Sequence, residues 1–173
     1  MLLPEPTYDG PENVVYFKGS DLEEELEKDK RITWFIELYA PWSPPCIQFS
    51  SCFSELSAKY HSENLRFAKV DLARNPQIAQ KFKINTHPMS KQIPTLILFK
   101  NGVEYQRRPL VGNDRKLIPF ALNFVSLMLN LFKVNLLNYF SKDNVVAQFD
   151  LNNIYDECKK NLKSSKSKRP KEE

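Results

Sequence analysis

The residues Trp42-Ser43-Pro44-Pro45-Cys46 are the part of the chain that comes closest to a redox motif. Thiol–disulfide exchange needs one thiolate that attacks and a second thiol that resolves the mixed disulfide. Two cysteines separated by two residues at the start of a helix meet that need, because the positive end of the helix lowers the pKa of the first thiol. Here Ser43 stands at the first position and Cys46 at the second. The motif therefore predicts a site with one thiol, which lacks the attacking group of dithiol catalysis.

Ser43 has a structural and a chemical interpretation. It is well placed as the N-cap of a helix whose first turn tolerates the two prolines that follow. A serine that acts as a hydrolase nucleophile needs an adjacent base. The only histidines are His61 and His87, and the sequence gives no sign that either approaches Ser43. The N-cap is the favoured interpretation.

Cys46 also has two interpretations. It begins an apolar stripe with Phe49, Phe53, Leu56 and Tyr60, at spacings of three and four residues. This position favours a buried cysteine that packs as a small hydrophobic side chain and reacts little. The alternative is a slow, regulatory monothiol near the positive end of the helix.

The other cysteines form no disulfide framework, because three is an odd number. Cys46 and Cys52 share the expected helix, and the rise per residue puts their Cα atoms about 9 Å apart, too far for a disulfide. We expect Cys52 to be structural and Cys158 to be the more exposed thiol. The sequence has no metal-ligand cluster and no Gly-rich phosphate loop, so we expect no metal and no cofactor.

Composition indicates one globular domain with a basic end. The chain has 173 residues, 42% of them apolar, which is enough for a single core. The net charge of +4 is local, because the last fifteen residues carry six Lys and one Arg against two Glu. We expect a disordered basic tail over residues 156–173 that binds no nucleic acid, because no aromatic side chains interleave its charges. Residues 1–13 form an N-terminal segment without signal-peptide features.

Apolar periodicity predicts alternating strands and helices. Helices are expected after Ser20, Ser43 and Asn75, each of which is a capping residue. The expected strands are Thr33–Tyr39, Leu65–Val70, Thr95–Phe99 and Val103–Leu110. The last two are joined by a hairpin turn at Asn101-Gly102. This order predicts an α/β fold with a mixed central sheet flanked by helices.

The apolar tract from Leu117 to Phe140 has two interpretations. It holds 24 residues with one charge, Lys133, which is long enough for a membrane span. Its polar residues Asn123, Ser126, Asn130 and Lys133 nevertheless recur at helical spacing and form one stripe. An amphipathic helix that covers the sheet is therefore favoured, and the chain alone is expected to be soluble.

Three segments resemble a thioredoxin domain of the protein disulfide isomerase kind over roughly Val14 to Phe120. They are Glu37-Leu38-Tyr39-Ala40-Pro41-Trp42, Lys69-Val70-Asp71 and Ile93-Pro94-Thr95. More specifically, the chain resembles the thioredoxin-related transmembrane protein 2 family. That resemblance rests on Gly10–Asn13, Leu22–Arg31, Ser90–Phe99, Arg107–Pro109 and Phe149–Tyr155. The family also has Ser at the first motif position and Cys at the fourth.

The resemblance implies a thioredoxin fold over residues 14–155 in an endoplasmic-reticulum membrane protein whose spans precede this domain. Residues 125–140 depart from the family and are expected to be an atypical insertion. The peptide bond between Ile93 and Pro94 is expected to be cis and to line a substrate groove. Glu37 matches the buried acid that shuttles protons in active relatives, and an ordinary, partly solvated Glu is the alternative.

Three functions remain open from the sequence. The first is a non-catalytic or weakly redox-active domain that binds protein clients through Trp42, Ser43 and Pro94, in redox homeostasis or protein folding. The second is a monothiol disulfide oxidoreductase or isomerase that acts through Cys46. The third is a scaffold domain without a groove ligand. The absence of a resolving thiol favours the first over the second.

Overall fold

The chain folds around one mixed sheet. The computed structural model describes residues 10–111, 117–118 and 140–167. Five strands form the sheet in the order β1-β3-β2-β4-β5, with β1, β3 and β2 parallel and with β4 and β5 antiparallel to their neighbours. The predicted mixed sheet is therefore confirmed. The elements are β1 (Val14–Phe17), α1 (Asp21–Lys28), β2 (Thr33–Tyr39), α2 (Pro44–Tyr60), β3 (Leu65–Asp71), α3 (Pro76–Lys81), β4 (Thr95–Lys100), β5 (Val103–Arg108), β6 (Leu110–Val111), β7 (Leu117–Ile118), α6 (Lys142–Phe149) and α7 (Leu151–Ser167).

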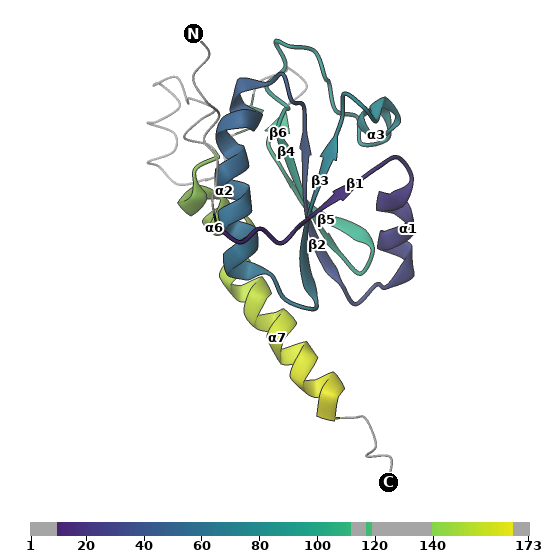
Figure 1. Cartoon of the computed structure of the whole chain (residues 1–173), viewed down its shortest axis with the longest axis vertical. Coiled ribbons are helices and arrows are strands. Elements are labelled where there is room, and N and C mark those ends of the chain that lie inside the picture. The colour runs from purple at the N-terminus through teal and green to yellow at the C-terminus, as the bar shows by residue number, and fades with distance from the viewer. Residues whose placement is uncertain (1–9, 112–116, 119–139, 168–173) are drawn as a thin grey trace.

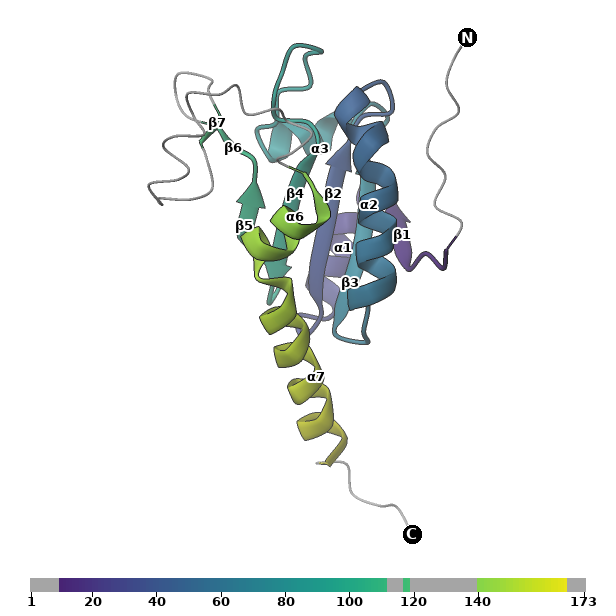
Figure 2. The ribbon, with the colours of Figure 1, turned by 90° about the vertical axis from the view of Figure 1, so that its left-hand side faces the viewer.

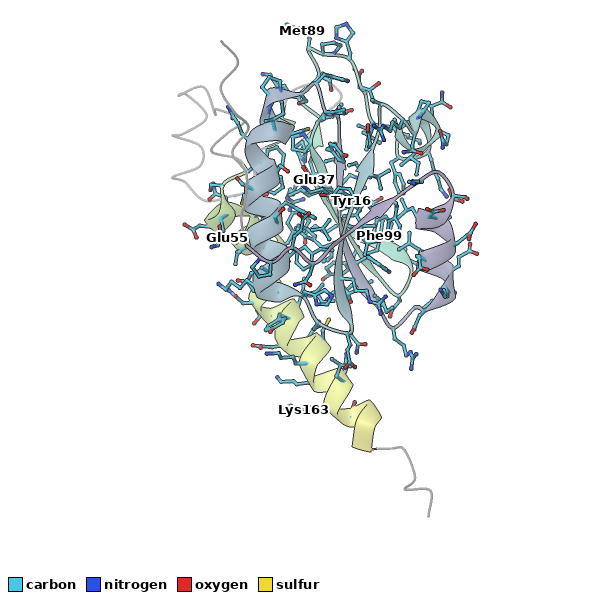
Figure 3. All side chains as sticks on the ribbon, viewed as in Figure 1. Tyr16, Glu37, Glu55, Met89, Phe99 and Lys163 are labelled. Carbon is cyan, nitrogen blue, oxygen red and sulfur yellow. The ribbon has the colours of Figure 1, made fainter. Side chains whose placement is uncertain are left out.

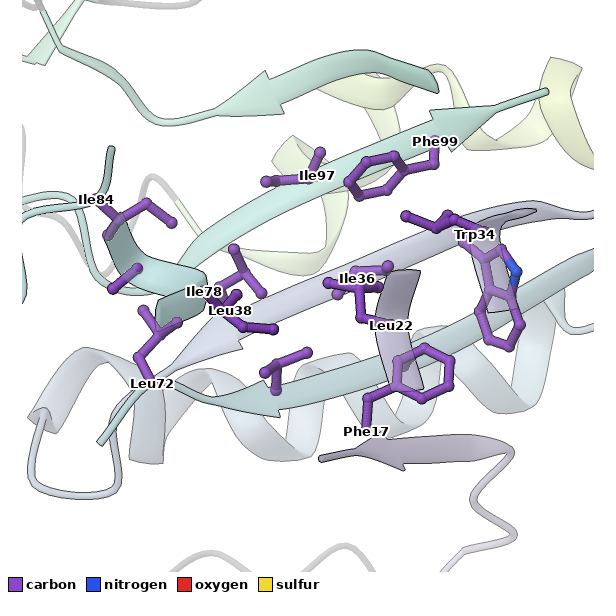
Figure 4. Packing of buried hydrophobic residues seen from close by; sticks show 14 of the residues in the cluster. Phe17, Leu22, Trp34, Ile36, Leu38, Leu72, Ile78, Ile84, Ile97 and Phe99 are labelled. Atoms are coloured by element: carbon purple, nitrogen blue, oxygen red, sulfur yellow. The ribbon is translucent and has the colours of Figure 1, made fainter. Parts of the chain in front are cut away.

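Helices cover both faces of the sheet (Figure 1). Successive side chains of a strand point to opposite faces, so β2 contributes to two cores. Trp34, Ile36 and Leu38 pack on the side of α1 and α3 (Figure 4). Phe35 packs on the side of α2, α6 and α7. The strand is mostly apolar because both of its faces are covered, and Glu37 is its one charged residue.

The turn between β4 and β5 requires a glycine. Asn101 and Gly102 both have a positive φ, 56° and 77°. A Cβ atom at Gly102 would lie 2.8 Å from the carbonyl oxygen of Leu26, which belongs to α1. The predicted hairpin therefore also fixes how closely α1 approaches the sheet.

The expectation of a disordered tail from residue 156 is wrong as far as Ser167. Helix α7 continues to that residue and projects beyond the body of the domain (Figure 2). Leu151, Ile154 and Cys158 recur at spacings of three and four residues and are buried in the α2-side core. The stripe was missed because the segment is mainly basic and polar. A helix packs with only one apolar face, so this composition does not exclude it. Residues 168–173 lie outside the described residues.

The helix expected from Leu117 does not begin at that residue. Leu117–Ile118 is strand β7, which pairs antiparallel with Leu110–Val111. Phe140 is buried in the α2-side core, where its ring lies 5.5 Å from that of Phe49. Residues 119–139, which hold the polar stripe and most of the expected insertion, lie outside the described residues.

Candidate functional site

The motif lies at the start of α2, directly after β2. Ser43 has the extended backbone of an N-cap, with φ −86° and ψ 116°. Its carbonyl oxygen accepts hydrogen bonds from the backbone N–H groups of Cys46 and Ile47, at 3.0 and 3.1 Å. Its hydroxyl makes no capping hydrogen bond and instead interacts with the thiol of Cys46. Ser43 therefore occupies the predicted N-cap position, but its buried side chain interacts with the thiol of Cys46 and not with the helix backbone.

Cys46 is buried, with 3% of its surface exposed. Burial raises the pKa of its thiol to about 12, although the hydrogen bond from Ser43 acts in the opposite direction. The thiolate is therefore scarce at neutral pH, and the thiolate is the nucleophile. The predicted stripe is wrong in one respect, because Cys46 packs in the α1-side core whereas Phe49 and Phe53 pack in the other.

The segment before β4 contributes to the same apolar core as Cys46. The peptide bond between Ile93 and Pro94 is cis, and both residues are buried. Ile93 belongs to the same cluster as Cys46. Of the three residues expected to bind clients, Trp42, Ser43 and Pro94, only Trp42 is exposed, with 44% of its surface accessible. Ser43 and Pro94 therefore present no side chain at the surface.

A buried ion pair lies beneath α2. Glu37 of β2 and Lys69 of β3 are partners in the parallel register, and Lys69 Nζ is 3.3 Å from Glu37 Oε2. Their side chains are 1% and 5% exposed. Lys69 Nζ also donates to Ser50 Oγ of α2 at 2.9 Å and lies 5.3 Å from the ring centre of Phe53. Glu37 is thus a buried acid and not the partly solvated one of the alternative interpretation.

Glu37 has a raised pKa in this buried pair. Burial raises the pKa of Glu37 to about 7, and the attraction of Lys69 offsets only part of this rise. Glu37 Oε2 has no hydrogen-bond partner, although Lys69 lies at ion-pair distance. Sequence reasoning assigned no role to Lys69, yet a lone lysine in the apolar run from Leu65 to Val70 is a signal of a buried partner.

The remaining thiols do not complete the site. Cys158 was expected to be exposed, but it is buried against Thr33 and Asn64, with Sγ 3.8 Å from Thr33 Oγ1 and 3.6 Å from the Asn64 carbonyl. This correction follows from the packing of α7. Cys52 is half-buried, and burial raises the pKa of its thiol to about 12. All three cysteines are free.

The histidines do not form a serine-hydrolase site with Ser43 in the described structure. His61 caps the far end of α2, and the helix rise puts it about 27 Å from Ser43. His87 is exposed, and its Nδ1 accepts a hydrogen bond from the backbone of Met89. Within the described residues, no three His, Cys, Asp or Glu side chains form a group that could hold a metal ion.

Comparisons with known proteins agree with this geometry. The sequence profile described as Thioredoxin matches residues 13–120. The chain is similar to the thioredoxin-related transmembrane protein 2 homolog of Drosophila melanogaster, with 43% identity over 91% of this chain and 52% of that protein. The homolog of Caenorhabditis elegans is 40% identical over 98% of this chain and 57% of that protein. The chain thus spans about half the length of these curated relatives. The resemblance predicted from the sequence is confirmed.

A solved structure supports the fold. A thioredoxin of Nicotiana alata aligns with a TM-score of 0.50 and 24% identity, over 63% of this chain and 89% of that one. This likeness concerns the fold alone. Among the residues that the structure describes, none of the helices has the length and apolar character of a membrane span.

Proposed function

The chain belongs to the thioredoxin family, and from that membership we propose that it is a protein-binding domain that does not perform dithiol catalysis. It acts on partner proteins in redox homeostasis or protein folding. The single observation that carries the proposal is the pairing of Ser43 with a buried Cys46. One position has no thiol, and the other has a thiol that is shielded from substrate.

Energetics support a binding role over an enzymatic one. A hydroxyl at Ser43 forms no disulfide and is not ionised at neutral pH. A Cys46 pKa of about 12 leaves roughly one thiol in 100,000 ionised at pH 7. Attack on a disulfide at a useful rate needs a larger thiolate fraction and access to solvent. Cys46 is better suited to packing than to turnover.

The proposed binding surface is centred on Trp42, because this side chain is exposed beside a buried motif. Large aromatic side chains supply much of the binding energy at protein interfaces when a partner covers them. We define the Trp42–Pro94 surface as the exposed side chain of Trp42 together with the backbone that flanks Ser43 and Pro94. Partner proteins, not nucleic acids or small cofactors, are the proposed ligands.

The membrane context comes from the relatives. The similar proteins of Drosophila melanogaster and Caenorhabditis elegans are named transmembrane proteins, and this chain spans about half of each. We propose that the domain belongs to an endoplasmic-reticulum membrane protein whose spans precede it. Detection of the full-length protein by membrane fractionation and alkaline extraction tests this placement. Release of the protein into the soluble fraction would contradict it.

Thiol labelling tests the proposed lack of catalysis. The native protein is treated with a maleimide at pH 7.5, and labelling at each cysteine is followed by mass spectrometry beside an insulin-reduction assay. We expect Cys46 to label only after denaturation and insulin reduction to remain at the background rate. The variant Cys46→Ala identifies the Cys46 signal, and Cys52→Ala is the matched control.

The outcomes separate the open functions. Rapid native labelling of Cys46 together with insulin turnover would support the monothiol oxidoreductase and contradict the proposal. A Trp42→Ala variant that captures client proteins from a native extract as well as the wild type does would favour the scaffold domain. Loss of capture in Trp42→Ala, with no labelling of Cys46, is the result that we expect.

A further inference from the structure

The segment from Lys83 to Gln92, which we call the 83–92 loop, joins α3 to β4. It holds no helix or strand. Met89 lies at its tip with 84% of its surface exposed, more than any other large hydrophobic side chain among the described residues. Figure 3 shows Met89 at the outer end of the molecule. One exposed apolar side chain is ordinary on a protein surface, and Met89 gains meaning only from the order, charge and position of the loop that carries it.

The 83–92 loop holds its own shape through hydrogen bonds. Its two ends are joined by Gln92 Oε1, which accepts from the backbone N–H of Asn85 at 2.5 Å. Its tip is held by three further bonds: the N–H of His87 donates to Asn85 Oδ1 at 2.9 Å, that of Met89 to His87 Nδ1 at 3.1 Å, and that of Ser90 to the His87 carbonyl at 2.8 Å. A loop that is ordered before binding loses less entropy when a partner arrives.

The loop lies in a stretch of the chain without acidic residues. No Asp or Glu occurs between Asp71 and Glu104. Lys83 and Lys91 precede and follow Met89 in the sequence, both are exposed, and neither makes an ion pair with a described residue. The other cations of this stretch are already paired: Arg74 with Asp71, Lys81 with Glu23 and Lys100 with Glu157. The two loop lysines are therefore available to a partner.

The loop stands beside the proposed binding surface. In both views it rises at the end of the molecule where α2 begins (Figures 1 and 2). Its last residue, Gln92, precedes Ile93, which packs in the same cluster as Cys46. The carbonyl of Gln92 also accepts a hydrogen bond from Thr95 Oγ1 at 2.5 Å, which ties the loop to β4. The loop is thus fixed to the start of β4 and to a residue of the core that also holds Cys46.

We propose that the 83–92 loop is the recognition element of this domain and that it binds a polypeptide segment with an apolar side chain flanked by acidic residues. The apolar side chain packs on Met89, whose thioether adapts to varied shapes. The acidic residues meet Lys83 and Lys91, which are exposed and make no ion pair with a described residue. This inference rests on the proposed function, because it names the partner chemistry of the same end of the domain.

Three labelled peptides of equal length test the inference on the full chain. The first carries Leu flanked by Asp, the second has Lys in place of each Asp, and the third has Ser in place of Leu. Fluorescence anisotropy at low salt gives the affinity of each peptide. We expect the first peptide to bind most tightly and its affinity to fall as salt rises, because exposed charge pairs are screened.

Matched variants locate the contact. The double variant Lys83→Glu/Lys91→Glu is expected to weaken binding of the first peptide about threefold to tenfold. Met89→Ala is expected to weaken it about threefold to fivefold, because buried apolar area is lost. The control Lys59→Glu/Lys163→Glu makes the same charge change at exposed lysines of α2 and α7 and is expected to leave the affinity unchanged. Thermal melts show whether each variant is folded.

The outcomes distinguish this inference from the proposed function. Equal binding of the three peptides, no binding of the first, or an equal loss in the control variant would overturn the recognition loop. If the loop variants change nothing but Trp42→Ala abolishes peptide or client binding, the loop assignment fails and the proposed function stands. If Trp42→Ala leaves binding intact while the loop variants reduce it, the loop binds a partner but the Trp42–Pro94 surface does not.

Discussion

The motif and the 83–92 loop lie at the same end of the domain and present their side chains in opposite ways. Ser43 and Cys46 carry the groups that suggest chemistry, and both are buried. The loop carries Met89 and two unpaired lysines, and all three are exposed. Chemistry needs accessible reactive groups, whereas recognition needs exposed surface. We therefore assign packing to the side chains of Ser43 and Cys46, and the proposed recognition falls to the loop and to the exposed Trp42.

Breaking the buried ion pair between Glu37 and Lys69 is expected to cause the largest loss of stability. Lys69→Met leaves the carboxylate of Glu37 buried without its partner, which costs about 3–5 kcal/mol of stability. The loss is expected to be larger at pH 8 than at pH 5, because Glu37 can be protonated at the lower pH. Urea denaturation at both pH values measures it. Lys59→Met on the surface of α2 is the control, and an equal loss there would contradict the assignment.

The pH dependence of the wild type follows from the same pair. The pKa of Glu37 is about 7 in the folded state against an ordinary value of 4.5, so the folded state binds the proton more tightly. This stabilising contribution is complete below about pH 4.5 and is lost as pH rises through 7, at about 1.4 kcal/mol per unit of pKa difference.

The variant Glu37→Gln isolates this contribution. Subtracting its stability curve from that of the wild type gives the share of Glu37, which we expect to fall between pH 4.5 and pH 7. A difference that stays flat over this window would show that Glu37 titrates normally and is not held by the buried environment.

Restoring the missing thiol tests whether the motif is limited by Ser43 alone. In Ser43→Cys the new thiol lies three residues before Cys46, where helical geometry brings Cα atoms to disulfide distance. With oxidised glutathione as the oxidant, which is reduced to two thiols, we expect a disulfide form that has lost two hydrogens and is more stable in urea by up to about 2 kcal/mol. Gln48→Cys, on the exposed side of α2, is the control. Failure to oxidise would mean that burial blocks the site as well.

Variants of the 83–92 loop are expected to change the free energy of unfolding less than variants of the motif. Gln92→Ala removes the hydrogen bond that joins the ends of the loop, which costs about 0.5–1.5 kcal/mol. Hydrogen exchange at the Asn85 amide measures the local opening, and Thr86→Ala in the same loop is the control. Unchanged protection at Asn85 would show that the loop is not held by Gln92.

The smallest stability effect is expected at the tip of the loop. Met89→Ala changes the free energy of unfolding by less than about 0.5 kcal/mol, because the side chain is 84% exposed. Ile93→Ala, four residues later in the core, is expected to cost about 2–5 kcal/mol in the same urea titration. A large loss in Met89→Ala would mean that Met89 packs within the domain and does not face a partner.

The sequence predicted the fold better than the site. Period-two and period-3.6 patterns follow from burial, so β2, α2 and the β4–β5 hairpin were predicted near their observed bounds. Helix α7 was missed because its charges outnumber its apolar residues, and only packing shows that Leu151, Ile154 and Cys158 share a buried face. The register between β2 and β3, which pairs Glu37 with Lys69, has no signal in either strand alone.

By itself, the sequence determined the thioredoxin fold and the absence of a second thiol, because residue identity and periodic burial are local properties of the chain. Only the tertiary structure decided that Cys46 is buried in the α1-side core, that Glu37 faces Lys69 and that Met89 is exposed in a loop with two unpaired lysines. Burial and partnership depend on residues far apart in the chain, and these determine whether a thiol, an acid or a lysine packs, titrates or binds.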